Sequence, residues 1–528
     1  MMRAKPLIAL AAAAVLTASL AACGGGGGES ASGDMKFGLG AEPPSLIPPN
    51  TTESEGSIIL SLTYAGLFDY NEKAEAENLL AKSIETKDNK TWTIEIEDGH
   101  KFHNGEPVDA EAFKRAWDWG AYAPNAATGS YFFDRIKGFA DMQGKKPKAK
   151  ELAGLKADGQ TLTIELDKPW AGFSTMLGYT AFLPMAEECV KDTKACNDKP
   201  IGNGPMKFDG KWKHKESISL VKNDKYKGPN KVKYDKADFT IYDGDANCWA
   251  DFESEDIDIC SPPVEKWEGA KNDPDLKERL ISEPSTSLTY LGMPVYDKAF
   301  QDKKLRQAFS LAIDREKVID IATPGRAVPA TEFAPPSLPG GVEGACEFCK
   351  FDAKEAKKLF EESSWPKGKK MEIWYNADPT NKAIFEAVGN QLKKNLGVEF
   401  ELVVKDWDPF LAATDKHKAK GPFRMGWLPD YPLNENYLKP IYGNGAANNR
   451  FGYEGKDFNK KLAEADAAKT LEEGMEIYAE AEKILAEEMI GIPLSWAKSS
   501  SFYSENIDPK SVKYFPVGQI QYDKLAPA

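Results

Sequence analysis

Histidine is scarce in this sequence, with only four among 528 residues. Metal sites and acid–base catalysis draw heavily on this side chain, so few such sites can be built here. The motifs H-E-x-x-H and G-x-S-x-G are also missing, which argues against a secreted peptidase or another hydrolase. His100 and His103 form one close pair, but no third or fourth metal ligand follows at a useful spacing. We therefore expect no catalysis, no metal and no cofactor.

Positive charge is in deficit. The chain has 68 Lys and Arg against 82 Asp and Glu, a formal net charge of −14. A protein that binds nucleic acid needs a basic surface against the phosphate backbone, so nucleic acid is excluded as the expected partner. Aromatic residues are plentiful by contrast, with 12 Trp and 19 Tyr. Such rings often line sites that hold flexible ligands.

No stretch of the chain reaches the ~20 apolar residues that a membrane-spanning helix needs. The apolar run from Leu7 to Leu16 follows the basic Arg3 and Lys5, which is the layout of a secretory signal peptide. It ends in LAAC, and a cysteine directly after small residues resembles the lipobox of bacterial lipoproteins. We predict a signal peptide over residues 1–22; cleavage at an A-x-A-like site without lipidation is the alternative.

Residues 23–34 are predicted to be a lipidated cysteine and a flexible linker. Cys23 is followed by Gly24 to Gly28 and by ESASGD, and such a Gly/Ser-rich stretch has little to bury. Acyl chains on Cys23 would hold the protein at the outer face of the cytoplasmic membrane, in an extracellular or periplasmic location. The body of the protein is expected to begin near residue 35.

Cysteine is sparse too, and six remain once Cys23 is set aside. They form local pairs in the sequence, which in an oxidising compartment suggests three small disulfide loops. The CEFC motif could instead be a zinc half-site or a redox dithiol, but no second CxxC lies nearby, so a structural disulfide is favoured. The pairing of the other four stays open. The candidates are Cys189, Cys196, Cys248, Cys260, Cys346 and Cys349.

Strand and helix patterns alternate along the chain. Period-two alternation predicts strands at 91–99, 161–167, 371–377 and 398–404. Amphipathic periodicity predicts helices at 109–122, 305–319 and 381–395, and one or two helices over 457–489. Asp109 is the expected N-cap of the first helix. This pattern indicates a mixed α/β class, and the roughly 495 residues after the linker suit two or three domains.

Nine motifs follow one another in an order that carries a resemblance. They are AEPPSLIPP (41–49), TYAGLFDYN (63–71), the segment 80–119, IGNGPMKF (201–208), VKNDKYKG (221–228), FESEDIDI (252–259), DKKLRQAFSLAIDREKVI (302–319), VPATEFAPP (328–336) and GWLPDYPLNENYL (426–438). In this order the chain resembles the extracellular solute-binding proteins of oligopeptide and dipeptide ABC importers, solute-binding protein family 5. It is nearer to the oligopeptide branch.

The resemblance implies a three-lobed α/β fold of the periplasmic-binding-protein type, class II, with an extra small domain. Two crossover connections between lobes would act as the hinge, and the ligand would lie between the closing lobes. The implied limits are 35–69, 186–288 and 494–528 for lobe I, 70–185 for lobe II and 289–493 for lobe III. We expect the protein to be a monomer.

The segment FRMGWLPDYP (423–432) is the implied ligand site. Asp430 lies among apolar residues and prolines, where an Asp either forms an Asx-turn or holds a charged partner. The resemblance implies the second role, with Asp430 paired to the N-terminal ammonium of a peptide. Gly426 and Leu428 would then offer backbone groups to the ligand, and Trp427 would form a wall.

Three further residues match positions that contact the ligand in relatives. Arg424 is a candidate partner for the C-terminal carboxylate of the peptide, with an ordinary surface arginine as the alternative. Trp407 and Tyr131 are candidate contact residues, with core packing as the alternative. Met206, Pro429 and the segment 433–435 depart from the family pattern, so preference for peptide side chains is left open.

The resulting prediction is a lipid-anchored protein that captures short peptides and delivers them to an ABC permease driven by ATPase subunits. A receptor of the same fold for a signalling peptide is compatible with the same residues. A non-peptide ligand such as a nickel chelate or a sugar is a further alternative, although Asp430 favours a ligand with an amine. A purely structural surface protein would not explain the nine motifs.

Overall fold

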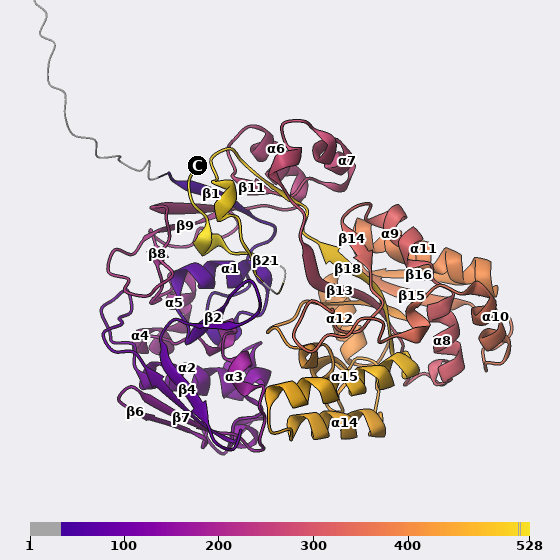
Figure 1. Cartoon of the computed structure of the whole chain (residues 1–528), viewed down its shortest axis with the longest axis horizontal. Helices are drawn as coiled ribbons and strands as arrows, with labels where there is room; N and C mark the ends of the chain where they lie inside the picture. The colour runs from indigo at the N-terminus through magenta and orange to yellow at the C-terminus, as the bar shows by residue number, and fades with distance from the viewer. Residues whose placement is uncertain (1–32, 516, 518) are drawn as a thin grey trace, which may run out of the picture.

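The computed structural model of the chain describes residues 33–515, 517 and 519–528 (Figure 1). Three main sheets with helices around them build it, so the α/β class is confirmed. The helices are α1 (Ser54–Thr63), α2 (Ala110–Ala121), α3 (Phe173–Met176), α4 (Glu187–Lys191), α5 (Thr193–Asp198), α6 (Asp245–Glu253), α7 (Val264–Asn272), α8 (Lys303–Leu311), α9 (Arg315–Ala322), α10 (Ala353–Glu361), α11 (Pro379–Leu396), α12 (Trp407–Asp415), α13 (Lys439–Tyr442), α14 (Lys456–Asp466) and α15 (Leu471–Glu488).

A seven-stranded sheet combines segments from both ends of the chain. Its order is β12 (Leu280–Ile281), β19 (Ser501–Tyr503), β11 (Ile259–Cys260), β1 (Met35–Leu39), β10 (Lys236–Ile241), β9 (Ser217–Lys222) and β8 (Met206–Phe208). In the central β1, Phe37 is fully buried and its ring lies 4.9 Å from that of Tyr522, centroid to centroid. Helix α1 packs Ile59 and Leu62 into the same core.

A four-stranded antiparallel sheet forms the second body. Its order is β4 (Ala81–Thr86), β5 (Thr91–Ile96), β7 (Thr161–Glu165) and β6 (Leu155–Asp158). The predicted strands at 91–99 and 161–167 are confirmed as β5 and β7. Helix α2 covers this sheet and begins where predicted, because Asp109 accepts a hydrogen bond from the backbone N–H of Ala112 at 3.0 Å. A short hairpin of β2 (Phe68–Tyr70) and β3 (Ala76–Asn78) lies before it in the chain.

A six-stranded sheet forms the third body, drawn mainly in orange in Figure 1. Its order is β14 (Ala327–Pro329), β18 (Gly491–Lys498), β13 (Pro284–Gly292), β17 (Phe423–Trp427), β15 (Met371–Asn376) and β16 (Phe400–Lys405). The predicted strands at 371–377 and 398–404 and the helix between them are confirmed as β15, β16 and α11. The segment 457–489 is two helices, α14 and α15.

One predicted helix is wrong in extent. The segment 305–319 forms two helices, α8 and α9, that are separated at residues 312–314. Asp314 adopts extended backbone and its carboxylate accepts a hydrogen bond from the N–H of Lys317 at 3.3 Å, which makes it the N-cap of α9. A cap residue needs non-helical backbone angles, so one continuous helix cannot pass through Asp314.

Two neighbouring connections join the seven-stranded and six-stranded sheets. One runs from β12 to β13 through residues 282–283, and the other from β18 to β19 through residues 499–500. The N–H of Ser499 donates to the carbonyl of Glu283 at 2.8 Å, so the two connections lie side by side. The implied lobe limits near 288 and 493 fall inside β13 and β18 and stay predictions.

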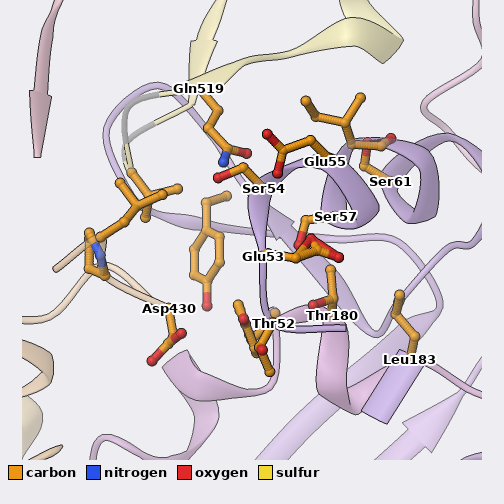
Figure 2. Close-up of a pocket in the computed structure, with 18 of the residues that line it drawn as sticks. Thr52, Glu53, Ser54, Glu55, Ser57, Ser61, Thr180, Leu183, Asp430 and Gln519 are labelled. Atoms are coloured by element: carbon orange, nitrogen blue, oxygen red, sulfur yellow. Dashed lines mark hydrogen bonds between the residues drawn. The ribbon is translucent and has the colours of Figure 1, made fainter. Parts of the chain in front are cut away.

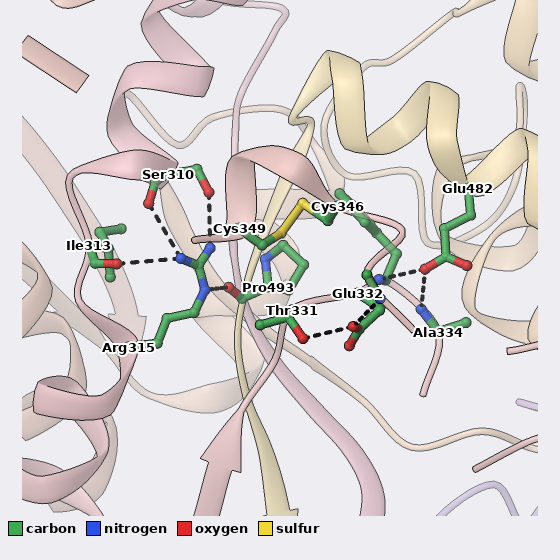
Figure 3. The surroundings of a disulfide bond; sticks show 12 residues. Ser310, Ile313, Arg315, Thr331, Glu332, Ala334, Cys346, Cys349, Glu482 and Pro493 are labelled. Atoms are coloured by element: carbon green, nitrogen blue, oxygen red, sulfur yellow. Dashed lines mark hydrogen bonds between the residues drawn. A yellow bond between two sulfur atoms is a disulfide. The ribbon is translucent and has the colours of Figure 1, made fainter. Parts of the chain in front are cut away.

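The structure contains three disulfides, Cys189–Cys196, Cys248–Cys260 and Cys346–Cys349. Figure 3 shows the last beside the loop 331–334. In that loop, the backbone N–H groups of Phe333 and Ala334 donate to the buried carboxylate of Glu482 at 2.7 and 2.9 Å. These bonds fix the loop against α15.

The predicted signal peptide and Cys23 lie outside the described residues. Over the part of the chain that the structure describes, no helix combines the length and the apolar character that crossing a bilayer requires. His103 is largely buried and its ring Nε2 lies 3.3 Å from the carbonyl oxygen of Gly204. Within the same residues, no group of three or more His, Cys, Asp or Glu is placed to hold a metal ion.

Candidate functional site

Strand β17 carries the FRMGW segment and lies between β13 and β15 in the six-stranded sheet. It pairs antiparallel with β13 along its whole length, with Gly426 opposite Thr289. On its other side it pairs with β15 only at Phe423, which lies opposite Trp374. The strand ends at Trp427, since Pro429 has no N–H to continue a ladder. Residues 428–430 therefore leave the sheet beside an open strand edge.

One buried amide holds Trp427 and Asp430 together. The Oδ1 atom of Asn436 accepts hydrogen bonds from the indole N–H of Trp427 at 3.0 Å and from the backbone N–H of Asp430 at 2.9 Å. Its Nδ2 donates to a carboxylate oxygen of Asp430 at 3.3 Å. Asn436 is 1% exposed, so these bonds are shielded from water. The sequence reasoning quoted Asn436 within NENYL but gave it no role.

Asp430 is a largely buried carboxylate that lacks a cation. It forms no ion pair with any residue in the described ranges. Burial raises its pKa to about 7, a rise that hydrogen bonds from Asn436 and Tyr179 oppose and the charge of Glu435 reinforces. The Asx-turn alternative fails for lack of a donor, because the residue two positions on is Pro432, which has no N–H. The carboxylate is available to a positively charged ligand.

The carboxylate opens into a cavity of about 700 Å³ (Figure 2). The walls come from all three bodies: residues 52–70 around α1, residues 128–131 and 178–183 beside the four-stranded sheet, and residues 426–430 at and after the end of β17. The C-terminal segment contributes Gln519 and its neighbours. Figure 2 shows Glu53 and Glu55 on the α1 side and Asp430 on the opposite side.

The structure brings most of the predicted site residues together. The cavity is lined by Tyr131, Gly426, Trp427, Leu428 and Asp430. Tyr179, which the sequence gave no reason to select, lines it as well and hydrogen-bonds Asp430. Burial and the charge of Asp430 raise the pKa values of the Tyr131 and Tyr179 hydroxyls well above their ordinary value, so both remain neutral.

Arg424 and Trp407 lie outside the lining of this cavity. The Arg424 guanidinium lies 6.0 Å from the centre of the Trp407 ring. A Cβ placed on Gly426 would come within 3.1 Å of Nη2 of Arg424, so this cation lies just behind the cavity wall. Its Nε has no hydrogen-bond partner and its side chain is absent from every ion pair of the described residues. Burial lowers the pKa of Arg424. Trp407 is 45% exposed, so core packing does not describe it.

A second cavity of about 350 Å³ adjoins the first and shares Tyr131 with it. Arg135 lines this second cavity and forms ion pairs with Glu435 at 2.9 Å and with Asp466 at 3.2 Å. Its guanidinium stacks on Trp170, 3.7 Å from the ring centre. Arg135 and Trp170 belong to the four-stranded body, whereas Glu435 and Asp466 come from the segments that follow β17. This ion cluster joins the two bodies.

Comparisons with known proteins show which proteins this chain is similar to. A model of the bacterial extracellular solute-binding proteins, family 5 (middle region), matches residues 75–449. The oligopeptide-binding protein OppA of Bacillus subtilis is 29% identical over 90% of this chain and 89% of its own length. The dipeptide-binding protein DppE of the same organism is 28% identical over 91% and 89%. The structure of the Escherichia coli murein tripeptide-binding protein MppA superposes with a TM-score of 0.79 at 23% identity, over 94% of this chain and 98% of that one.

Proposed function

The chain belongs to the bacterial extracellular solute-binding proteins of family 5, and from this premise we propose that it captures short peptides for an ABC importer. The observation that carries the proposal is Asp430, a carboxylate without a cation in a cavity between three bodies. The relatives named above bind oligopeptides, dipeptides and a murein tripeptide, which supports a peptide as ligand.

Recognition of the peptide begins at its N-terminus. Every unmodified peptide carries an α-ammonium, so a carboxylate that faces it sets the register without reading side chains. Asn436 and Tyr179 orient Asp430 for this contact. A peptide without the ammonium leaves Asp430 buried and unpaired, which costs about 3–5 kcal/mol of binding free energy.

The backbone of the peptide would be read by the open edge of β17. Beyond Phe423, the β15 side of this strand has no partner strand in the described part of the chain. An extended peptide that joins this edge would use backbone groups of Gly426 and Leu428, in the manner of β-strand addition. Trp427, held by Asn436, would form the wall beside the first peptide residues.

Arg424 is the proposed partner of the C-terminal carboxylate, and Trp407 the proposed aromatic contact beside it. The support is a largely buried guanidinium without an acidic partner, just behind Gly426. A fixed cation at one distance from Asp430 would favour one peptide length. Closure of the three proposed lobes about the connections at 282–283 and 499–500 would bring these walls together around the ligand.

The proposed setting is the outer face of the cytoplasmic membrane. Lipidation at Cys23 would anchor the protein, and residues 24–34 would let a monomeric body reach the permease, whose ATPase subunits drive import. The peptide would be handed over unchanged, since the proposed role is binding without catalysis. Mass spectrometry of peptide recovered after long incubation would reveal any cleavage.

Calorimetric titration tests the proposal directly. The purified protein is unfolded and refolded to strip bound ligand, then titrated with tri- to hexapeptides of alanine that carry free or acetylated N-termini. We expect binding of the free set, a loss of about 100-fold or more on acetylation, and a similar loss with Asp430→Asn. Glu85→Gln, a change at an exposed residue of β4, is the matched control and should bind normally. Equal binding of both peptide sets would remove Asp430 from the site, and no binding of either would refute peptide capture.

A further inference from the structure

The large cavity is strongly acidic. Among its lining residues, Arg450 is the single Lys or Arg, against six carboxylates: Glu53, Glu55, Asp69, Asp415, Asp430 and Asp523. Arg450 pairs with Asp415 at 2.6 Å, and Lys524 pairs with Asp523 at 3.2 Å. The other four carboxylates form no ion pair within the described residues. The ammonium of a peptide accounts for Asp430 and leaves Glu53, Glu55 and Asp69.

Glu53 caps helix α1 with only one of its two carboxylate oxygens. One of its carboxylate oxygens, Oε2, caps α1 by accepting a hydrogen bond from the N–H of Gly56 at 3.0 Å. The other oxygen, Oε1, is enclosed and has no hydrogen-bond partner among the residues that the structure describes. Burial, with the charge of Glu55, raises the pKa of Glu53 to about 7, although the Gly56 hydrogen bond opposes the shift. The cap therefore uses only half of the carboxylate.

Asp69 is another carboxylate that lines this cavity and forms no ion pair with a described residue. It accepts a hydrogen bond from its neighbour, the N–H of Tyr70, at 2.8 Å. Burial and then the charge of Asp523 raise its pKa to about 6, and Lys524, already paired with Asp523, only partly opposes the rise. A second cation near this wall would relieve the repulsion.

Tyr64 places a neutral polar group in the lining of the same cavity. It lines the same cavity and is 2% exposed, with its ring packed against Leu60 and Leu183. Its hydroxyl has no hydrogen-bond partner among the described residues and is not one of their enclosed unpaired atoms, so it is open to the cavity. Burial raises its pKa above the ordinary value, so the hydroxyl is neutral and can accept a hydrogen bond from an ammonium or guanidinium.

These groups are spread along the wall and do not converge on a point. No three acidic, His or Cys side chains of the described residues are close enough to hold a metal ion. Several separated carboxylates suit a ligand with charges at separate positions, as an extended peptide has. In a site shielded from water, each ionic contact is stronger than at the surface.

We propose that this cavity selects basic peptides, in which a lysine or arginine side chain contacts the wall formed by Glu53, Glu55 and Asp69 while the α-ammonium contacts Asp430. The inference rests on the proposed function, because it assumes that the cavity holds a peptide. It assigns a substrate class to the site: peptides with at least two positive charges.

Peptides of matched shape test this selection on the unmodified protein. Alanine tri- to hexapeptides, all with free N-termini, carry lysine, acetyl-lysine or glutamate at one internal position, and each position is scanned by calorimetry. At the best position, we expect lysine to bind about tenfold or more tighter than acetyl-lysine and glutamate to bind weakest. The lysine preference should shrink as salt is raised. If lysine and acetyl-lysine bind equally at every position, the inference is wrong while peptide capture stands. If none of the peptides binds, peptide capture itself fails.

Substitutions then locate the preference. Glu55→Gln and Asp69→Asn should each reduce the ratio of lysine to acetyl-lysine affinity, and Glu53→Gln should do so if the α1 cap survives. Glu85→Gln, which alters a charge outside the cavity, should leave the ratio unchanged. An unchanged ratio in all three cavity variants would contradict the assignment to this wall.

Discussion

Asp430 and Glu435 lie five residues apart, and both carboxylates are buried, yet the protein treats them in opposite ways. Glu435 is 1% exposed and accepts an ion-pair contact from Arg135 at 2.9 Å and a hydrogen bond from the Tyr431 hydroxyl at 2.6 Å. Asp430 receives hydrogen bonds from Asn436 and Tyr179 but no cation. One site is complete within the protein, and the other lacks its counter-charge.

The two carboxylates differ because Glu435 belongs to the ion cluster of Arg135, whereas Asp430 lines the large cavity. Burial lowers the pKa of Arg135, but Asp466 and Glu435 outweigh that effect and shift it upward, so this arginine stays charged. The Arg135 cluster can hold the four-stranded body against the segment after β17 with or without ligand. For Asp430, with its raised pKa, the proposed counter-charge is the ammonium of a bound ligand. The three predictions below test this contrast.

The largest effect is expected from Arg135→Ala. The change leaves Glu435 and Asp466 without their central cation, which should lower the free energy of unfolding by about 3–5 kcal/mol. Urea unfolding without ligand measures it. Lys137→Ala removes an exposed ion pair with Glu165 and should cost only about 0–1 kcal/mol. The double change Arg135→Met with Glu435→Gln should recover part of the lost free energy of unfolding. Equal losses of unfolding free energy for Arg135→Ala and Lys137→Ala would contradict a structural role of the Arg135 cluster.

The pH dependence of binding is the second expectation. The folded pKa of Asp430 is about 7, above the ordinary 3.8, so between about pH 4 and pH 7 the free folded protein holds this proton while the unfolded chain has lost it. Its contribution to stability therefore falls as pH rises from about 4 to about 7. An ammonium ligand needs the ionised form, so affinity should fall by up to about tenfold per unit below pH 7.

Proton release measures this linkage. Titration of an all-alanine peptide at pH 6 in buffers of different ionisation enthalpy should show uptake of a proton by the buffer on binding. Asp430→Asn provides the control, because any slope that persists there belongs to Glu53, Asp69 or Glu435. A flat affinity profile between pH 5 and 7 in the unmodified protein would contradict a proton on Asp430.

Asn436→Ala should have the smallest effect. It removes the hydrogen bonds that orient Asp430 and Trp427, so affinity for peptides with a free ammonium should fall about tenfold. Loss of the Asn436 donor should also move the pH midpoint of binding upward, which a general loosening of the fold would not do. Asn395→Ala, a change on α11, removes a comparable hydrogen bond to the Ala312 carbonyl and should change neither quantity. An unchanged pH midpoint of binding would contradict the proposal that Asn436 positions Asp430.

Local elements were the part of the fold that the sequence predicted well. Asp109 fits an N-cap and does begin α2, and the period-two segments at 91–99 and 161–167 are paired strands. These signals lie within a few residues of one another, so no tertiary information is needed to interpret them. The one helix expected over 305–319 failed because Asp314 had to be recognised as a cap inside an amphipathic pattern.

The candidate site was predictable on the segment 426–430 and, through the family resemblance, at Tyr131. The motif GWLPDYP selects Asp430 and its neighbours, and five of the seven predicted contact residues line the cavity. Tyr179 and Glu53 approach from about 250 and 380 positions earlier in the chain, as the residue numbers show. No local pattern distinguishes such residues from ordinary surface or core residues.

The sequence by itself determined the mixed α/β class, the family resemblance, the export layout and an Asp among apolar neighbours. Each of these follows from the composition or from residues that lie close together in the chain. Only the tertiary structure decided which carboxylates meet a cation and which do not. Arg135 pairs with Glu435 across 300 residues, while no cation of the described residues forms an ion pair with Asp430, Glu53, Glu55 or Asp69. Pairing of buried charges depends on distance in space, which folding sets and residue order does not reveal.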